Sequence, residues 1–206
     1  MTRKQIISAV LVFILMPVSA FATVIGGSSS SGTFEYISPI PGGFTVGDNN
    51  QQSPNLFAFD EDQNINITST VTVNVGTNPV NGDVVASHYI FFDPDASTST
   101  RGWVDFDADV YGIITQTTEL LASDFLANTG VTYLNPGLRG LESGDTATID
   151  GTFAYRVNID FTASNPGDYI RVLTMRSPLA DVPEPSMAGL LGLGLLGLLG
   201  LRRRKQ

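Results

Sequence analysis

Apolar and polar residues alternate with a period of two along two stretches of the chain. This pattern predicts that residues 23–182, the body of the chain between its two terminal segments, form β-structure. Across residues 65–75, apolar side chains and one serine occupy the odd positions, and Asn or Thr the even positions. The same alternation runs across residues 153–161. Successive side chains of a strand point to opposite faces of a sheet, so each stretch predicts a strand with one buried and one solvated face.

Segments typical of turns separate these stretches. Asn78-Pro79, Asn81-Gly82 and Asn165-Pro166-Gly167 combine residues that favour tight turns. The last of them predicts a hairpin between the strand at 153–161 and a final strand at 169–176. Five further strands are predicted at 33–37, 55–59, 84–92, 103–114 and 130–134.

One short helix is predicted over residues 119–128. Its leucines and Phe125 have the spacing of a helix that covers a sheet, and Thr117 or Thr118 would cap its first turn. No repeat of 20–50 residues is visible. Many short strands with one helix predict an all-β fold, an antiparallel β-sandwich or jelly roll in a single domain.

Composition limits what the body binds. Residues 23–182 contain no cysteine, so no disulfide can stabilise them and a single hydrophobic core is expected to do so. They carry five arginines, no lysine and nineteen Asp or Glu residues, which gives a net charge of −14. A phosphate backbone would be repelled, so nucleic-acid binding is disfavoured and no nucleic-acid partner is expected. Such an acidic surface could bind divalent cations or hydrated polysaccharide. The alternative is an acidic surface that is solvated and binds no ligand.

The C-terminal segment has three parts in a fixed order. Pro183-Glu184-Pro185 is predicted to be extended, because each proline fixes φ near −65°. Residues 187–201 contain only Met, Ala, Gly and Leu, and four cations follow, Arg202, Arg203, Arg204 and Lys205. As a helix the apolar part is about 22 Å long, and snorkelling arginines with local thinning would let it cross the bilayer. The cations would remain cytoplasmic.

Residues 183–205 resemble the PEP-CTERM sorting signal of Gram-negative bacteria in all three parts. The resemblance implies recognition by exosortase, a membrane-embedded cysteine transpeptidase, which removes the tail near Pro183, Glu184 and Pro185. The body is then released or attached to surface polymer, and these residues are substrate rather than catalyst. A buried soluble helix and an unprocessed membrane anchor are the alternatives, although five glycines and the lack of a polar face disfavour the soluble helix.

The N-terminus has the features of a secretory signal peptide. Arg3 and Lys4 precede an apolar stretch at 6–18, and Ala20 and Ala22 provide the small residues of a signal-peptidase site with a cut after Ala22. A retained membrane helix is the alternative. With both basic ends inside, the residues between them are expected to lie in the periplasm. The predicted organisation is signal peptide 1–22, flexible Gly/Ser leader 23–32, β-sandwich 33–181 and sorting signal 182–206.

An acidic stretch in one predicted strand is the best candidate for metal binding. Asp105, Asp107 and Asp109 would share one face, with side chains about 6–7 Å apart. Calcium accepts such oxygen ligands. An EF-hand loop is excluded, because Val110 and Gln116 occupy the positions of its glycine and glutamate. The alternative is the solvated face of a half-buried strand.

Trp103 and Tyr111 fall on the same predicted face and would form an aromatic strip able to stack on sugar rings. The alternative is that they pack in the core or across strands.

Catalysis has little support. His88 is the single histidine, it lies in a predicted strand without a serine elbow nearby, and the chain has no thiol. A second acidic group, Asp60-Glu61-Asp62, is predicted to be a turn.

The sequence therefore predicts a non-enzymatic cell-surface or extracellular-matrix protein, associated with exopolysaccharide, whose partners are signal peptidase and an exosortase-like transpeptidase. The alternative is a carbohydrate- or calcium-binding β-sandwich module of the matrix.

Overall fold

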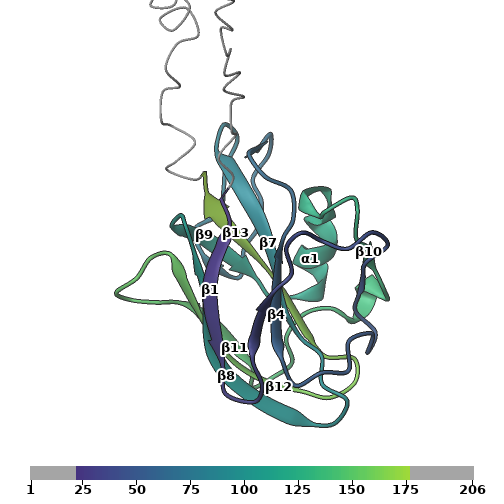
Figure 1. Cartoon of the computed structure of the whole chain (residues 1–206). Helices are drawn as coiled ribbons and strands as arrows, with labels where there is room; N and C mark the ends of the chain where they lie inside the picture. The colour runs from purple at the N-terminus through teal and green to yellow at the C-terminus, as the bar shows by residue number, and fades with distance from the viewer. Residues whose placement is uncertain (1–21, 177–206) are drawn as a thin grey trace, which may run out of the picture. The chain divides into compact units, whose positions relative to one another are not determined.

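Two β-sheets and an outer layer of helix and loops build the fold (Figure 1). The structure, a computed structural model, describes residues 22–176, all of which belong to one compact unit of the chain.

The smaller sheet has four antiparallel strands in the order β1-β8-β12-β11. Their bounds are Val24–Ser29 for β1, Thr98–Phe106 for β8, Arg156–Ala163 for β12 and Thr146–Ile149 for β11.

The larger sheet has seven strands, in the order β2-β4-β7-β13-β9-β6 with β5 paired to β7. Only the β2–β4 pair in this sheet is parallel. The bounds are Phe34–Tyr36 for β2, Leu56–Asp60 for β4, Ile65–Asn66 for β5, Val75–Gly76 for β6, Val84–Phe92 for β7, Val110–Ile114 for β9 and Asp168–Met175 for β13.

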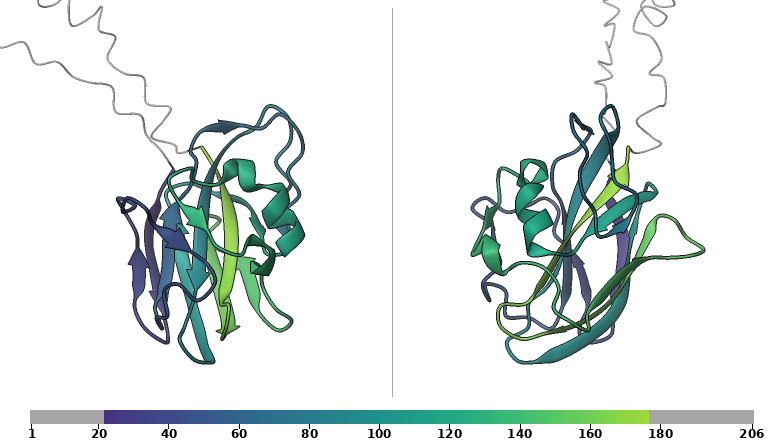
Figure 2. Two further views of the ribbon diagram at one scale, coloured as in Figure 1. Left: turned by 90° about the vertical axis from the view of Figure 1, so that its right-hand side faces the viewer. Right: turned by 180° about the vertical axis from the view of Figure 1, so that it is seen from behind.

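The outer layer covers one face of the larger sheet. It contains helix α1 and two 3₁₀ turns, and Figure 2 shows α1 lying over this sheet. A short parallel pair of β3 and β10 completes the layer. The bounds are Thr117–Ala122 for α1, Asp124–Leu126 for η1, Pro136–Leu138 for η2, Thr45–Val46 for β3 and Thr132–Tyr133 for β10.

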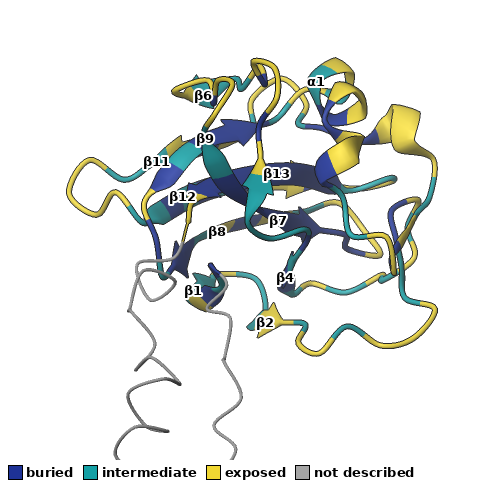
Figure 3. Cartoon of the chain, turned by 90° about the horizontal axis from the view of Figure 1, so that it is seen from above, coloured by how far each residue is buried: buried dark blue, intermediate teal, exposed yellow. Residues whose placement is uncertain are grey.

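Two cores hold these layers together. The first lies between the sheets and includes Phe161 of β12 and Ile90 of β7. The second lies between the larger sheet and the outer layer, where Phe59 and Phe91 pack with Leu120 of α1. Strands β4, β7 and β13 are therefore largely buried, as Figure 3 shows. Each large apolar side chain buried in this way stabilises the fold by ~1.5–3 kcal/mol.

The predicted fold class is confirmed, because the described residues form antiparallel sheets with one α-helix. The strand predicted at 84–92 has the bounds of β7. The helix is shorter than predicted. It ends at Ala122, and its N-cap is Gln116, without a side-chain capping bond.

The clearest predicted strand, 65–75, is mostly a loop. Only its two ends pair as strands, in β5 and β6. Between them the backbone bonds to the segment that follows, through Val71 N to Pro79 O at 2.9 Å and Ile67 N to Asp83 O at 2.8 Å. Ile67 and Val71 are nonetheless buried in the second core. The alternation therefore reflects which side chains cover the larger sheet, and not a continuous strand.

The predicted strand at 103–114 is two strands in different sheets. β8 ends at Phe106 in the smaller sheet and β9 begins at Val110 in the larger one. The chain crosses between the layers at residues 107–109.

The predicted hairpin at Asn165-Pro166-Gly167 is wrong for a similar reason. β12 pairs with β8 and β11, whereas β13 pairs with β7 and β9. The turn thus carries the chain from one sheet to the other, because both strands bury apolar side chains in the core between the sheets.

The segment predicted as a flexible Gly/Ser leader forms strand β1. It pairs with β8 from Val24 opposite Phe106 to Ser29 opposite Gly102. Its glycines permit close packing, since a Cβ on Gly27 would lie 2.5 Å from the Phe34 ring.

Candidate functional sites

The acidic stretch does not form the predicted common face. Asp105 lies on β8 opposite Arg156 of β12. Arg156 Nε donates to Asp105 Oδ1 at 2.6 Å, and Nη2 donates to Oδ2 at 2.8 Å. This bidentate pair uses both oxygens of the carboxylate.

Asp107 and Asp109 lie in the crossover between the sheets, where they hold the two ends of the described domain. Thr23 N donates to Asp107 Oδ1 at 2.9 Å, and Asp107 N donates to Thr23 O at 3.0 Å. Met175 N donates to Asp109 O at 2.8 Å. Among residues 22–176, no three His, Asp or Glu side chains are placed to hold a metal ion. The strand face on which the calcium hypothesis depended is absent.

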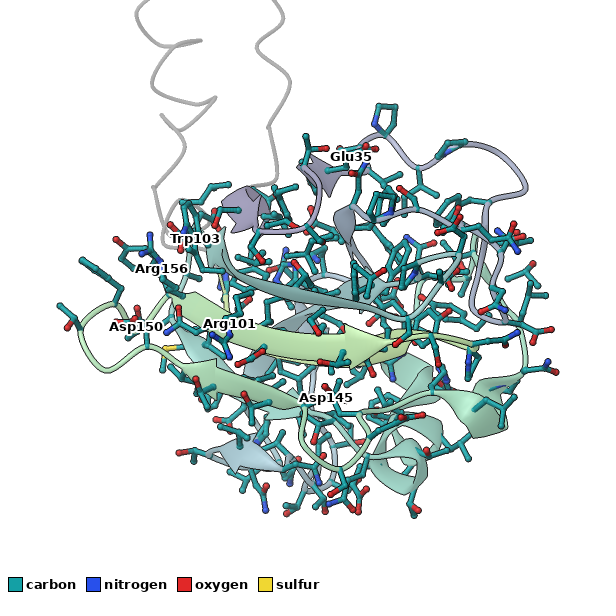
Figure 4. All side chains as sticks on the ribbon, turned by 90° about the horizontal axis from the view of Figure 1, so that it is seen from below. Glu35, Arg101, Trp103, Asp145, Asp150 and Arg156 are labelled. Atoms are coloured by element: carbon teal, nitrogen blue, oxygen red, sulfur yellow. The ribbon has the colours of Figure 1, made fainter. Side chains whose placement is uncertain are left out.

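Trp103 and Tyr111 lie on different sheets, so they form no common strip. Trp103 is half-buried on the outer face of the smaller sheet, and the guanidinium carbon of Arg156 lies 4.1 Å from its ring centroid. Figure 4 shows these two side chains together at one end of that face. Tyr111 packs against the second core. The separation again follows from the crossover at residues 107–109.

His88 is fully buried in β7. Its Nδ1 lies 2.7 Å from Asp60 Oδ1, and its Nε2 lies 3.0 Å from Thr174 Oγ1. Burial acts to raise the pKa of Asp60, but hydrogen bonds from His88, Tyr36 and Thr23 outweigh it and hold that pKa below its usual value. The ionised carboxylate only accepts, so Nδ1 carries the proton. Both ring nitrogens are thus engaged away from solvent.

A buried ion pair beneath α1 was not predicted from the sequence. Glu61, which was assigned to a turn, is fully buried with Arg171 of β13. Arg171 Nε donates to Glu61 Oε2 at 2.6 Å, and Nη1 donates to Ser123 Oγ at 2.7 Å. Burial alone would lower the pKa of Arg171, and the Glu61 carboxylate more than offsets this and raises it. The signal that could have revealed this pair is Arg171 itself, which stands between apolar residues in a predicted strand.

The ends of the chain divide between described and undescribed residues. Ala22 is fully buried and packs with Ala86 and Ala108. Ala20, the motif at 183–185, the apolar segment 187–201 and the basic residues 202–205 lie outside the described residues. Within residues 22–176, no helix has the length and apolar character needed to cross a membrane.

Comparison with known proteins identifies the C-terminal segment. The family model of the PEP-CTERM protein-sorting motif matches residues 181–205. No curated protein and no solved structure matches the chain. The matched residues include the Pro-Glu-Pro tripeptide, the apolar segment and the basic end. The chain therefore carries a PEP-CTERM protein-sorting motif at its C-terminus and is an exported protein that is sorted by an exosortase-like enzyme.

Proposed function

We propose that this chain is a non-enzymatic protein of the cell surface or extracellular matrix, whose β-domain is delivered outward and retained among exopolysaccharide. The match of the sorting motif to residues 181–205 carries this proposal. Signal peptidase removes the N-terminal segment, and the C-terminal apolar segment holds the precursor in the inner membrane. The exosortase-like enzyme then removes the tail.

The outer face of the smaller sheet supports a structural role. Its polar side chains bond mainly to one another across strands, as in the pair Ser99 Oγ and Thr162 Oγ1 at 2.9 Å. Arg101 Nε donates to Asp160 Oδ2 at 2.8 Å. These paired groups present a polar, hydrated surface on which charges are matched. The burial of His88 removes the one imidazole from contact with a substrate.

The contacts of Thr23 support a mature chain that begins at this residue. A cut after Ala22 would turn the Thr23 amide, 2.9 Å from Asp107 Oδ1, into a charged amino group. The new ion pair would offset the loss of the buried Ala22 methyl group, which costs ~1 kcal/mol.

Intact-mass measurement on protein from its own cells tests the proposal. We expect the wild-type chain to begin at Thr23 and end near Pro185, and the Pro183→Ala variant to retain its tail. The Pro178→Ala variant is the matched control, because it removes a proline from just outside residues 181–205. It should be processed like the wild type. A wild-type chain that keeps Arg202 in a host with exosortase would contradict the proposed processing.

A further inference from the structure

A cavity opens between helix α1 and the loop that follows β5. Its volume is about 320 Å³. The loop contributes Thr70, Val71 and Thr72, and the helical segment contributes Thr118, Glu119 and Phe125. Ligand pockets in proteins range from about 300 to 1,000 Å³, so this one has room for a single small ring.

The cavity combines an aromatic wall with hydroxyl groups. Phe125 is 58% exposed, so its ring is available as one wall of the cavity. Thr70, Thr72 and Thr118 are also exposed, so their hydroxyl groups are open to a ligand. Val71 is buried behind them. A ligand that fits must therefore present both an apolar face and hydrogen-bonding edges.

Glu119 supplies an acceptor without a donor. Its Oε2 has almost no solvent contact and no hydrogen-bond partner in the structure. A buried polar group without a partner is costly, and a hydrogen bond to a charged acceptor is among the stronger ones. Glu119 itself is half-buried and lines the cavity, so its carboxylate can accept a hydrogen bond from a ligand there.

The helical wall of the cavity is fixed from below. Arg171 Nη1 donates to Ser123 Oγ at 2.7 Å and to Leu120 O at 3.2 Å. Both acceptors belong to the segment that carries Glu119 and Phe125. The wall is thus held in place before a ligand binds, which lowers the cost of binding.

We propose that this cavity binds one uncharged sugar unit of a polysaccharide. The apolar face of the ring lies against Phe125, one sugar hydroxyl donates to the Glu119 carboxylate, and the threonine hydroxyls bond to the others. An acidic sugar is disfavoured by Glu119 and by the net charge of −14 on residues 23–182. This sugar site would give the proposed matrix protein a ligand. Only the source of the sugar, the surrounding exopolysaccharide, rests on the proposed function.

Saturation-transfer NMR on the full chain tests this binding. The chain is kept in zwitterionic micelles, because detergents with sugar headgroups would compete for the cavity. The probes are cellotriose and maltotriose, which are neutral, and trigalacturonate, which is acidic. We expect at least one neutral trisaccharide to bind with a millimolar or lower Kd. Both Glu119→Gln and Phe125→Ala should weaken this binding at least tenfold.

Leu121→Ala is the matched control. Leu121 is 45% exposed on the same helix but does not line the cavity, so its variant should bind like the wild type. The inference is overturned if neither neutral trisaccharide binds, if trigalacturonate binds as tightly, or if the Glu119 and Phe125 variants retain wild-type affinity. None of these results depends on cleavage of the tail, so a failure here is distinct from a failure of the intact-mass experiment.

Discussion

At the scale of single residues, the ion pair of Arg171 and Glu61 places two opposite charges in the interior of the fold. Both side chains are fully buried, and Glu61 also accepts from Ser87 Oγ and Tyr133 OH, each at 2.6 Å. Removing one partner leaves the other charge buried without compensation. We expect Arg171→Met to lower the free energy of unfolding by ~3–5 kcal/mol, measured by urea denaturation.

Two comparisons make this prediction specific. Arg101→Met removes an arginine that is 79% exposed and paired with Asp160, so it should cost less than ~1 kcal/mol. The double variant Arg171→Met with Glu61→Leu should be more stable than Arg171→Met alone, because no unpaired charge remains. If the Arg101 and Arg171 variants lose equal stability, the buried pair has no special importance.

Asp168 gives the fold a pH dependence. Burial, with the nearby charges of Asp145 and Glu142, raises the pKa of Asp168 to about 8. The unfolded chain releases this proton near pH 4. The contribution of Asp168 to stability is therefore complete below that pH and is lost as the pH rises toward 8.

The Asp168→Asn variant should not show this loss. We expect its free energy of unfolding to rise relative to the wild type by on the order of 1 kcal/mol per pH unit between about pH 4 and pH 8. Asp95→Asn removes the same charge from an exposed loop and is the control. Parallel pH curves for the wild type and the Asp168 variant would show that this prediction is wrong.

Residue types alone could not reveal these features. The chain has nineteen acidic residues between 23 and 182, and their pattern does not distinguish buried Glu61 from exposed Asp95. The distinction depends on a pairing of residues 110 positions apart, Glu61 with Arg171. The candidate site at Asp105 was misassigned for the same reason, because its partner Arg156 is distant in the sequence.

At the scale of elements, close contact between β1 and β8 depends on a glycine. A Cβ on Gly102 would lie 1.9 Å from the carbonyl oxygen of Ser28. Gly102→Ala should therefore push β1 away and cost ~1–3 kcal/mol. We expect faster hydrogen exchange at the Ser30 amide, which donates to Arg101 O at 2.9 Å.

Gly151→Ala is the control for this change, because a Cβ there meets no atom within 4 Å. The amides of the β7–β13 ladder should keep their protection in both variants, since that ladder lies in the other sheet. Unchanged exchange at Ser30 in the Gly102 variant would mean that β1 tolerates the added methyl group.

Elements buried on both faces were the most predictable. Strands β7 and β13 are buried along nearly their whole length, and residues 84–92 and 169–176 were predicted almost to their ends. Partner choice was not predictable, because β12 and β13 follow one another in the chain but lie in different sheets. The Gly/Ser composition of residues 26–31 suggested flexibility, whereas pairing with β8 orders β1.

At the scale of the whole molecule, export depends on a linear sequence motif, whereas the fold depends on contacts between residues far apart in the sequence. The sorting motif is a linear segment, so it could be predicted from the sequence alone. The cavity beside α1 depends on two segments about 50 residues apart, centred near Val71 and Glu119, and no local pattern indicates it. The two cores of the described domain are formed by residues between 24 and 173.

Replacing the four terminal cations by alanine should therefore change delivery without changing the fold. Arg202, Arg203, Arg204 and Lys205 are expected to hold the C-terminus in the cytoplasm. Without them, the tail loses its orientation, and we expect a smaller fraction of the chain to be cut. Intact mass of the membrane and external fractions measures the cut. Circular dichroism on heating should give a Tm equal to that of the wild type.

The matched control for the terminal cations is Arg176→Ala, which removes a cation on the N-terminal side of the sorting motif. It should leave the ratio of cut to uncut chain at the wild-type value, because this arginine precedes the apolar segment. A quadruple variant that is cut as completely as the Arg176 variant would show that the basic end is dispensable. A lower Tm in the quadruple variant would instead show that the tail contributes to the stability of the β-domain.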